Sequence, residues 1–163
     1  MHQKEDIAYE RAKRLIYLCQ GVVAFIVLMV FAFHTPLFHV TGLSGLSFDY
    51  ATGLIVIYGI ACIIRMGNWC MNDTYRSAGD STTGTVLEIV FMYVLILPTM
   101  LILWKLVDAP FLIVFASGYI DEPIRYVIMQ RHMYSGKWIR PVTPEGKAKV
   151  EAFLTDIKSS RNK

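Results

Sequence analysis

The sequence predicts an all-α membrane protein with four transmembrane helices and a short amphipathic helix at its C-terminal end. Of its 163 residues, 55% are hydrophobic, and the mean hydropathy is +0.44. Four long apolar stretches divide the chain, each close to the roughly 20 residues that a helix needs to cross a hydrocarbon core. So short a chain has too little polar sequence to enclose four such helices in a soluble core.

The predicted spans cover about residues 15–33, 50–71, 85–106 and 110–130. The apolar part of the first span is too long for a secretory signal peptide, and it lacks a small-residue cleavage pattern. We therefore assign residues 1–143 to a transmembrane domain and residues 144–163 to a cytoplasmic tail.

Basic residues predict the orientation of the chain in the cell membrane. They precede the first span, lie in the second link and follow the last span, whereas the first link contains no lysine or arginine. Cytoplasmic segments collect these residues, so we expect both termini and the second link in the cytoplasm. The net charge of +3 then reflects topology and gives no reason to expect nucleic acid as a partner.

The tail changes character after the last span. Thr143 is a candidate N-cap with Pro144 at the first helical position, and apolar residues then recur at helical spacing from Val150 to Ile157. This pattern is typical of a short amphipathic helix on the inner leaflet. A frayed, solvated tail is the open alternative.

The second span carries a polar stripe on one helix face. Arg65, Asn68, Asn72 and Arg76 are spaced three, four and four residues apart. A charged residue in lipid costs roughly 2.5–3.5 kcal/mol on insertion scales, so we expect the stripe to face a bundle interior or a water-filled cavity. Arg76 lies near the cytoplasmic end, where snorkelling or helix capping would also explain it.

The third span contributes three secondary candidates. Glu88 lies near the start of this span, where an acid complements the helix dipole, and one of the residues 81–83 is expected to cap the helix. Pro98 should interrupt the hydrogen bonds of the helix and kink it. Tyr93, between them, is expected to pack against other side chains.

The fourth span contains "GYIDEPIRYVIMQRH", which places Asp121, Glu122 and Arg125 where the chain should still be crossing lipid. The spacing lets Arg125 neutralise either acid within its own helix. Pro123 frees the carbonyl group of Tyr119, which needs a partner in a membrane. Two hypotheses follow: a structural ion-pair clamp between helices, or an ion or substrate pathway.

Enzyme and metal signatures are absent from the sequence. There is no H-E-x-x-H, Walker loop or G-x-G-x-x-G motif, and Cys19, Cys62 and Cys70 have no neighbours at metal-ligand spacing. We expect no catalytic activity, no metal and no cofactor.

Several segments, taken together and in order, resemble a known transporter family. "NDTYRSAGDSTTG" is similar to the "N-G-x-x-R-A-G-G-D-T" signature at the tenth span of multidrug and toxic compound extrusion (MATE) transporters. "LEIVFMYVLILP" resembles their eleventh span, "YIDEPIRYVIMQRHMYSGKWIR" the end of the twelfth, and "AYERAKR" the entry to the ninth. The resemblance covers about residues 7–143 and places Arg76, Gly79 and Asp80 in the cytoplasmic turn between the second and third spans.

The resemblance implies part of a secondary antiporter that exports organic cations or toxic compounds in exchange for protons or sodium. The family has twelve spans, so we expect the chain to be a fragment or a shortened relative, with a missing N-terminal portion or a second chain as partner. Ala78 replaces the first glycine of the signature, and Arg65 lies near the depth of a second-lobe cation site, which is therefore not carried over. The alternative is a non-transporting structural or regulatory four-span protein.

Overall fold

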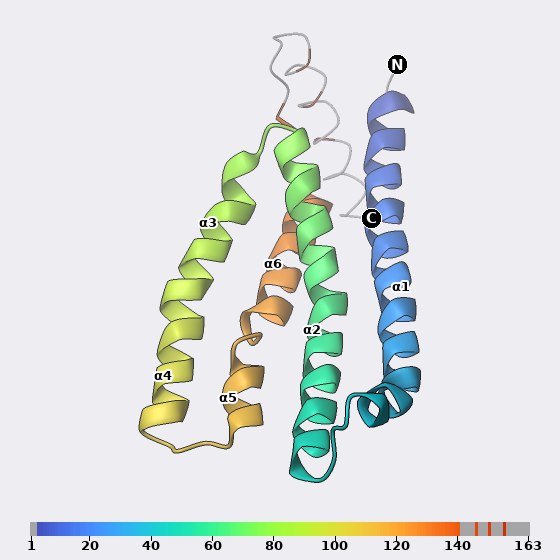
Figure 1. Cartoon of the computed structure of the whole chain (residues 1–163). Helices are drawn as coiled ribbons and strands as arrows, with labels where there is room; N and C mark the ends of the chain where they lie inside the picture. Colours follow the sequence, from blue (N-terminus) through green and yellow to red (C-terminus); the bar gives the residue numbers. More distant parts are fainter. Residues whose placement is uncertain (1–2, 141–145, 147–149, 151–154, 156–163) are drawn as a thin grey trace.

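The computed structural model describes residues 3–140 and the single positions Gly146, Val150 and Thr155 (Figure 1). All regular elements of this part of the chain are helices, which confirms the predicted all-α class. The predicted tail helix, residues 144–163, lies outside the described residues except at those three positions.

The first helix is longer than predicted. α1 extends over Gln3–Val40, so residues 34–40 of the expected first link continue the helix. Pro36 lies inside α1, and Figure 1 shows that the helix bends near this end. A proline removes one hydrogen bond and clashes with the preceding turn, which accounts for the bend.

The next two passes of the chain match the predicted second and third spans. α2 covers Leu46–Ser77, and the third pass consists of α3 (Ser81–Phe91), the π-helix η1 (Met92–Ile96) and α4 (Leu97–Lys105) in direct succession. The π-helix ends two residues before Pro98, so the predicted irregularity at this proline takes the form of a widened turn.

Three helical segments are long and apolar enough to cross a membrane: Tyr9–Val40, Leu46–Ser77 and Ser81–Lys105. The segment predicted as the fourth span is not a single kinked helix. It is divided into α5 (Phe111–Ser117) and α6 (Asp121–Ser135), which are joined by a short turn. Pro123 therefore lies in the first turn of a new helix, where backbone N–H groups have no partner within the helix, so the N–H that proline lacks is not needed.

α2 lies between the other elements and packs against α1 on one side and against α3 and α6 on the other (Figure 1). The buried apolar core lies toward one end of this arrangement and consists of Ile16, Met71, Tyr75, Met129, Met133 and Trp138. Large apolar side chains elsewhere face outward, for example Leu18 and Phe25, which are 65% and 62% exposed. Such a surface suits a lipid environment.

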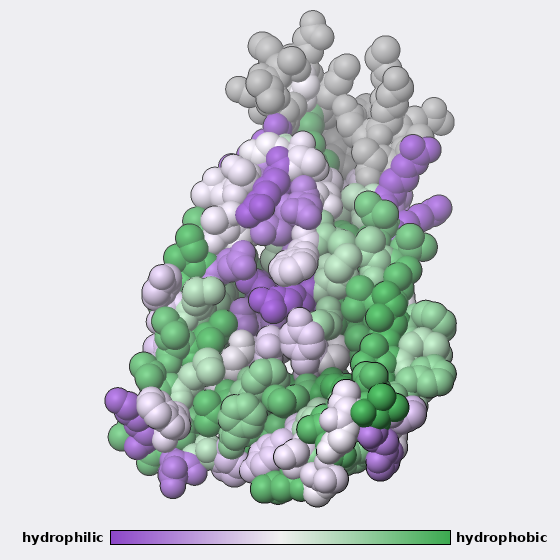
Figure 2. Space-filling model, viewed as in Figure 1, coloured by the Kyte–Doolittle hydropathy of each residue, from purple (hydrophilic) through white to green (hydrophobic). Residues whose placement is uncertain are grey.

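One face of the molecule departs from this apolar exterior. Figure 2 shows hydrophilic residues from the upper end of the face down to its middle, with apolar surface on both sides. Polar groups at the middle of a membrane helix bundle mark the place to look for a functional site.

Candidate functional site

The break between α5 and α6 positions two acidic side chains at a helix N-terminus. Asp121 and Glu122 occupy the first turn of α6, where the helix dipole favours negative charge. The carbonyl group of Tyr119, expected to need a partner, accepts a hydrogen bond from the backbone N–H of Glu122 at 3.2 Å. Both acids are buried, with 3% and 2% of their surface exposed.

Glu122 is the centre of a network of polar contacts that joins α2 to α6. Its Oε2 accepts a hydrogen bond from Asn68 Nδ2 at 2.7 Å and pairs with Arg125 Nη2 at 3.0 Å. Its Oε1 lies 3.2 Å from Arg65 Nε. Asn68 Nδ2 also donates to the backbone oxygen of Glu122 at 3.1 Å. A single carboxylate therefore contacts three polar side chains from two helices.

Arg125 extends the network to a third helix. Its Nη1 lies 3.8 Å from Asp121 Oδ2 and 4.0 Å from Glu88 Oε1 on α3. Glu88 differs from the other two acids because 41% of its side chain is exposed. The network thus contains three carboxylates and two guanidinium groups, which leaves one negative charge in excess when all are ionised.

Two further contacts concern the predicted residues Asn72 and Arg65. Asn72 borders a small hollow with Asn68, Glu88 and Arg125. Arg65 also contacts Trp69, with its guanidinium carbon 5.5 Å from the ring centroid. These residues, including Glu88 from the secondary set, come together at one place.

Two secondary candidates lie elsewhere. Tyr93 and Pro98 are both exposed, Tyr93 to 64% of its surface. The expectation that Tyr93 packs against other side chains is therefore wrong for the described part of the chain. Neither Tyr93 nor Pro98 contributes to the ionic network.

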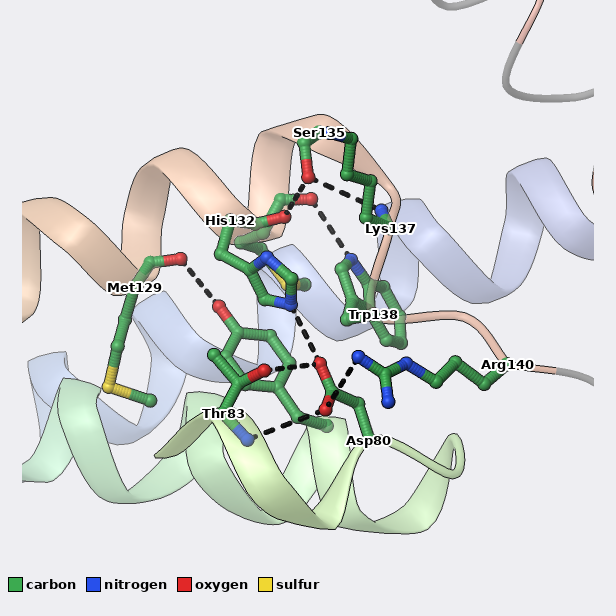
Figure 3. Close-up of polar contacts among 10 residues, drawn as sticks. Asp80, Thr83, Met129, His132, Ser135, Lys137, Trp138 and Arg140 are labelled. Carbon is green, nitrogen blue, oxygen red and sulfur yellow. Dashed lines mark hydrogen bonds and ion pairs between the residues drawn. The ribbon is translucent and has the colours of Figure 1, made fainter. Parts of the chain in front are cut away.

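A second polar cluster, the end cluster, holds one end of the bundle and consists of Asp80, Thr83, His132 and Arg140 (Figure 3). Asp80 is fully buried and is the N-cap of α3, in place of the residues 81–83 that the sequence suggested. It accepts hydrogen bonds from Thr83 Oγ1 at 2.8 Å and from the Thr83 backbone N–H at 3.4 Å.

Two bases complete the contacts of Asp80. His132 Nε2 lies 2.8 Å from Oδ2, and Arg140 Nη2 lies 3.2 Å from Oδ1. Burial by itself would raise the pKa of Asp80, but hydrogen bonds from Thr83 and His132 and the charge of Arg140 outweigh burial and hold this pKa below its ordinary value. The cluster therefore stabilises an ionised carboxylate that ties α6 and the segment after it to the α2–α3 link.

The other two residues predicted for this link have separate roles. Gly79 has a φ of +93°, and a Cβ there would lie 2.7 Å from the backbone oxygen of Arg140, so both conformation and space favour glycine. Arg76 still belongs to the last turn of α2, is exposed, and donates a hydrogen bond to Thr85 at 3.2 Å.

Sequence reasoning missed His132 and Arg140 as partners of Asp80. They are separated from it by 52 and 60 residues, so helical spacing carries no signal of the contact. In the described part of the chain, no group of three or more His, Cys, Asp or Glu residues has the arrangement of a metal site.

The chain matches no protein-family model, no curated protein and no solved structure.

Proposed function

We propose that the chain is part of a MATE-type secondary antiporter, which exports organic cations or other toxic compounds in exchange for protons or sodium. The observation that carries the proposal is the ionic network with three carboxylates and two guanidinium groups on three helices of an apolar protein. The order and spacing of the sequence segments that resemble this family support the same proposal.

The excess carboxylate is the chemical reason for a transport role. Acidic residues within membrane segments are costly and mark ion or proton pathways in many transporters. A network with equal numbers of acids and bases would be satisfied without an ion from outside. The third acid, Glu88, lies 4.0 Å from the guanidinium of Arg125, which Asp121 and Glu122 also contact. Its side chain remains half-exposed. It is available to a proton, sodium ion or cationic substrate.

The break in the chain between α5 and α6 also supports a transport role. Irregular backbone at membrane depth is tolerated where it is buried in protein or lines a water-filled cavity. Discontinuous helices form the binding sites of several secondary transporters. We take α5 and α6 together as a fourth crossing of the membrane, antiparallel to the third.

We further propose that both termini face the cytoplasm. The start of α1 and the end of α6 lie at the same end of the bundle (Figure 1), and the rings of Tyr9 and Trp138 are 6.4 Å apart. The lysine and arginine distribution then assigns this end, together with the α2–α3 link, to the cytoplasm. A further transporter portion, in the same or a second chain, would complete the substrate pathway.

A structural or regulatory membrane protein is the second candidate, favoured by one observation. Both guanidinium groups of the network already have carboxylate partners, at 3.2 Å for Arg65 and 3.0 Å for Arg125. Such contacts between α2 and α6 would hold the helices together without any transport.

Export of a fluorescent organic cation from a pump-deficient host tests the proposal. The full reading frame is compared with Asn68→Leu and Asn72→Leu variants, after membrane insertion of each has been verified. We expect normal insertion with impaired export, because both side chains lie beside the network. Unchanged export by both variants would assign these asparagines to packing and favour the structural candidate.

A further inference from the structure

A small hollow lies where α2, α3 and α6 meet beside the ionic network. Its polar lining comes from Asn68, Asn72, Glu88 and Arg125, and the backbone of Gly84 forms part of its wall. Its volume is about 10 Å³, which is close to the space that one water molecule requires.

Three buried polar atoms of the lining residues have no hydrogen-bond partner among the described residues: Asn68 Oδ1, Asn72 Oδ1 and Arg125 Nε. The orientation of the Asn68 amide is set by its nitrogen, which donates to two oxygens of Glu122, so its own oxygen is left without a donor. Asn68 and Arg125 are only 2% and 5% exposed, and bulk solvent cannot satisfy these atoms.

We infer that the hollow is a binding site for one ordered water molecule, which donates hydrogen bonds to Asn68 Oδ1 and Asn72 Oδ1 and accepts one from Arg125 Nε–H. Buried polar groups in proteins are almost always paired with protein or ordered water. Two acceptors and one donor around a space of this size match the hydrogen-bonding capacity of water.

A metal cation fits the same lining less well than water does. The two amide oxygens and Glu88 would suit a cation, but the guanidinium of Arg125 lines the same space and would repel it. The N–H of Arg125 Nε also requires an acceptor, which water supplies and a metal ion cannot.

The bound water links α2, through Asn68 and Asn72, to α6, through Arg125, and so adds to the direct contacts of the ionic network. Glu88 of α3 lines the same hollow. This site goes beyond the proposed function, because its existence does not require transport, and it can be tested on the chain alone.

Solid-state NMR of the labelled full-length chain in lipid bilayers provides the test. Magnetisation transferred from water to the side-chain carboxamide carbons of Asn68 and Asn72 is compared with transfer to the methyl group of Met71, which is fully buried in the apolar core and does not line the hollow. We expect rapid transfer to both carboxamides and slow transfer to Met71.

Gly84→Ala is the variant that disturbs the hollow, because a Cβ at this position would overlap with the side-chain amide of Asn72 and force this lining group to move. Gly21→Ala is its matched control, since a Cβ at this helical glycine has nothing within 4 Å. Asn72→Leu keeps the approximate size of the side chain and removes one acceptor. We expect loss of the rapid transfer to Asn68 in Gly84→Ala and Asn72→Leu and no change in Gly21→Ala.

Slow transfer to both carboxamides in the unmodified chain would overturn the inference, even if both hollow variants fail to fold. Rapid transfer that persists in a folded Gly84→Ala variant would also overturn it, because the water would then lie elsewhere. Transfer that changes when sodium replaces potassium in the buffer would show that the hollow takes a cation. Absence of export by the unmodified full reading frame, with the water signal intact, would count against the proposed function alone.

Discussion

The two charged clusters of this protein differ in their ratio of acidic to basic side chains. In the end cluster, one fully buried carboxylate, Asp80, is held by His132, Arg140 and Thr83. In the ionic network, three carboxylates share Arg65 and Arg125. The acid of the end cluster has close partners, whereas one acid of the network, Glu88, has none closer than 4.0 Å among the described residues.

This difference separates a structural role from a functional one. A buried carboxylate with several close partners holds segments together and gains nothing from a further ion. A network with a spare acid has a reason to take up a proton or cation, and its half-exposed member, Glu88, gives access to it. Substitutions within the two clusters and beside them separate these roles.

The largest effect is expected for Arg125→Gln. This change leaves Asp121 and Glu122 buried, and among the described residues only Glu122 keeps an ion-pair partner, Arg65. Breaking a buried pair costs on the order of 3–5 kcal/mol. Thermal unfolding in detergent should therefore occur at a markedly lower temperature than for the unmodified chain.

Adding Glu122→Gln to Arg125→Gln provides the control, since it removes one of the stranded charges. We expect partial recovery of the unfolding temperature in the double variant. A double variant that is less stable than Arg125→Gln would mean that the two side chains do not act as a pair.

A smaller loss, about 1.5–3 kcal/mol near neutral pH, is expected for Asp80→Asn, because hydrogen bonds to a charged group are replaced by neutral ones. The folded-state pKa of Asp80 is lowered, so its stabilising contribution is complete above the unfolded-state value and lost as the pH falls through the folded-state pKa. The difference in unfolding temperature between the variant and the unmodified chain should shrink below about pH 4.

Asp73→Asn is the matched control, because Asp73 is an exposed acid on α2. It should change the unfolding temperature little at any pH. A constant difference between Asp80→Asn and the unmodified chain from neutral to acid pH would contradict the assigned role of the carboxylate.

Tyr75→Phe should cost about 1 kcal/mol, the net value of a typical hydrogen bond. Tyr75 is fully buried, and its hydroxyl donates to the backbone oxygen of Met129 between the two clusters. Thermal unfolding measures the effect, and Tyr93→Phe, at an exposed tyrosine, should have none. Equal losses in the two variants would show that the contact with Met129 does not contribute.

The smallest effect is expected for Arg76→Ala. This side chain is exposed, and within the described part of the chain it donates a hydrogen bond to Thr85 alone. Surface substitutions of this kind usually change the unfolding free energy by less than about 0.5 kcal/mol. A loss as large as that of Asp80→Asn would place Arg76 in the end cluster.

The helical class and the positions of the first three spans could be predicted because apolar length and helical spacing are local properties. The end of α1 at Val40 could not, because polar residues and Pro36 in the expected link favour a helix end. The division of the last span at residues 118–120 was also missed, although Gly118 and Pro123 were visible in the sequence.

The ionic network could be predicted in part. Spacing within one helix suggested the pairing of Arg125 with Asp121 or Glu122 and placed Arg65, Asn68 and Asn72 on one face. The contact of Asn68 and Arg65 with Glu122 depends on how α2 packs against α6. These partners are more than 50 residues apart in the sequence. No pattern in a single sequence contains that information.

Neutralising the acids of the network one at a time tests its proposed role most directly. Asp121→Asn and Glu122→Gln each leave two carboxylates for two guanidinium groups, so the excess negative charge is removed. Export of an organic cation is measured for both across a range of pH, with thermal stability in detergent measured on the same variants. We expect Asp121→Asn to leave stability close to that of the unmodified protein, and Glu122→Gln to lower it because Arg65 and Arg125 lose their closest carboxylate. Export should be lost or shifted in its pH dependence in both variants. Normal, pH-insensitive export by both variants would contradict the pathway and leave the network as a clamp between helices.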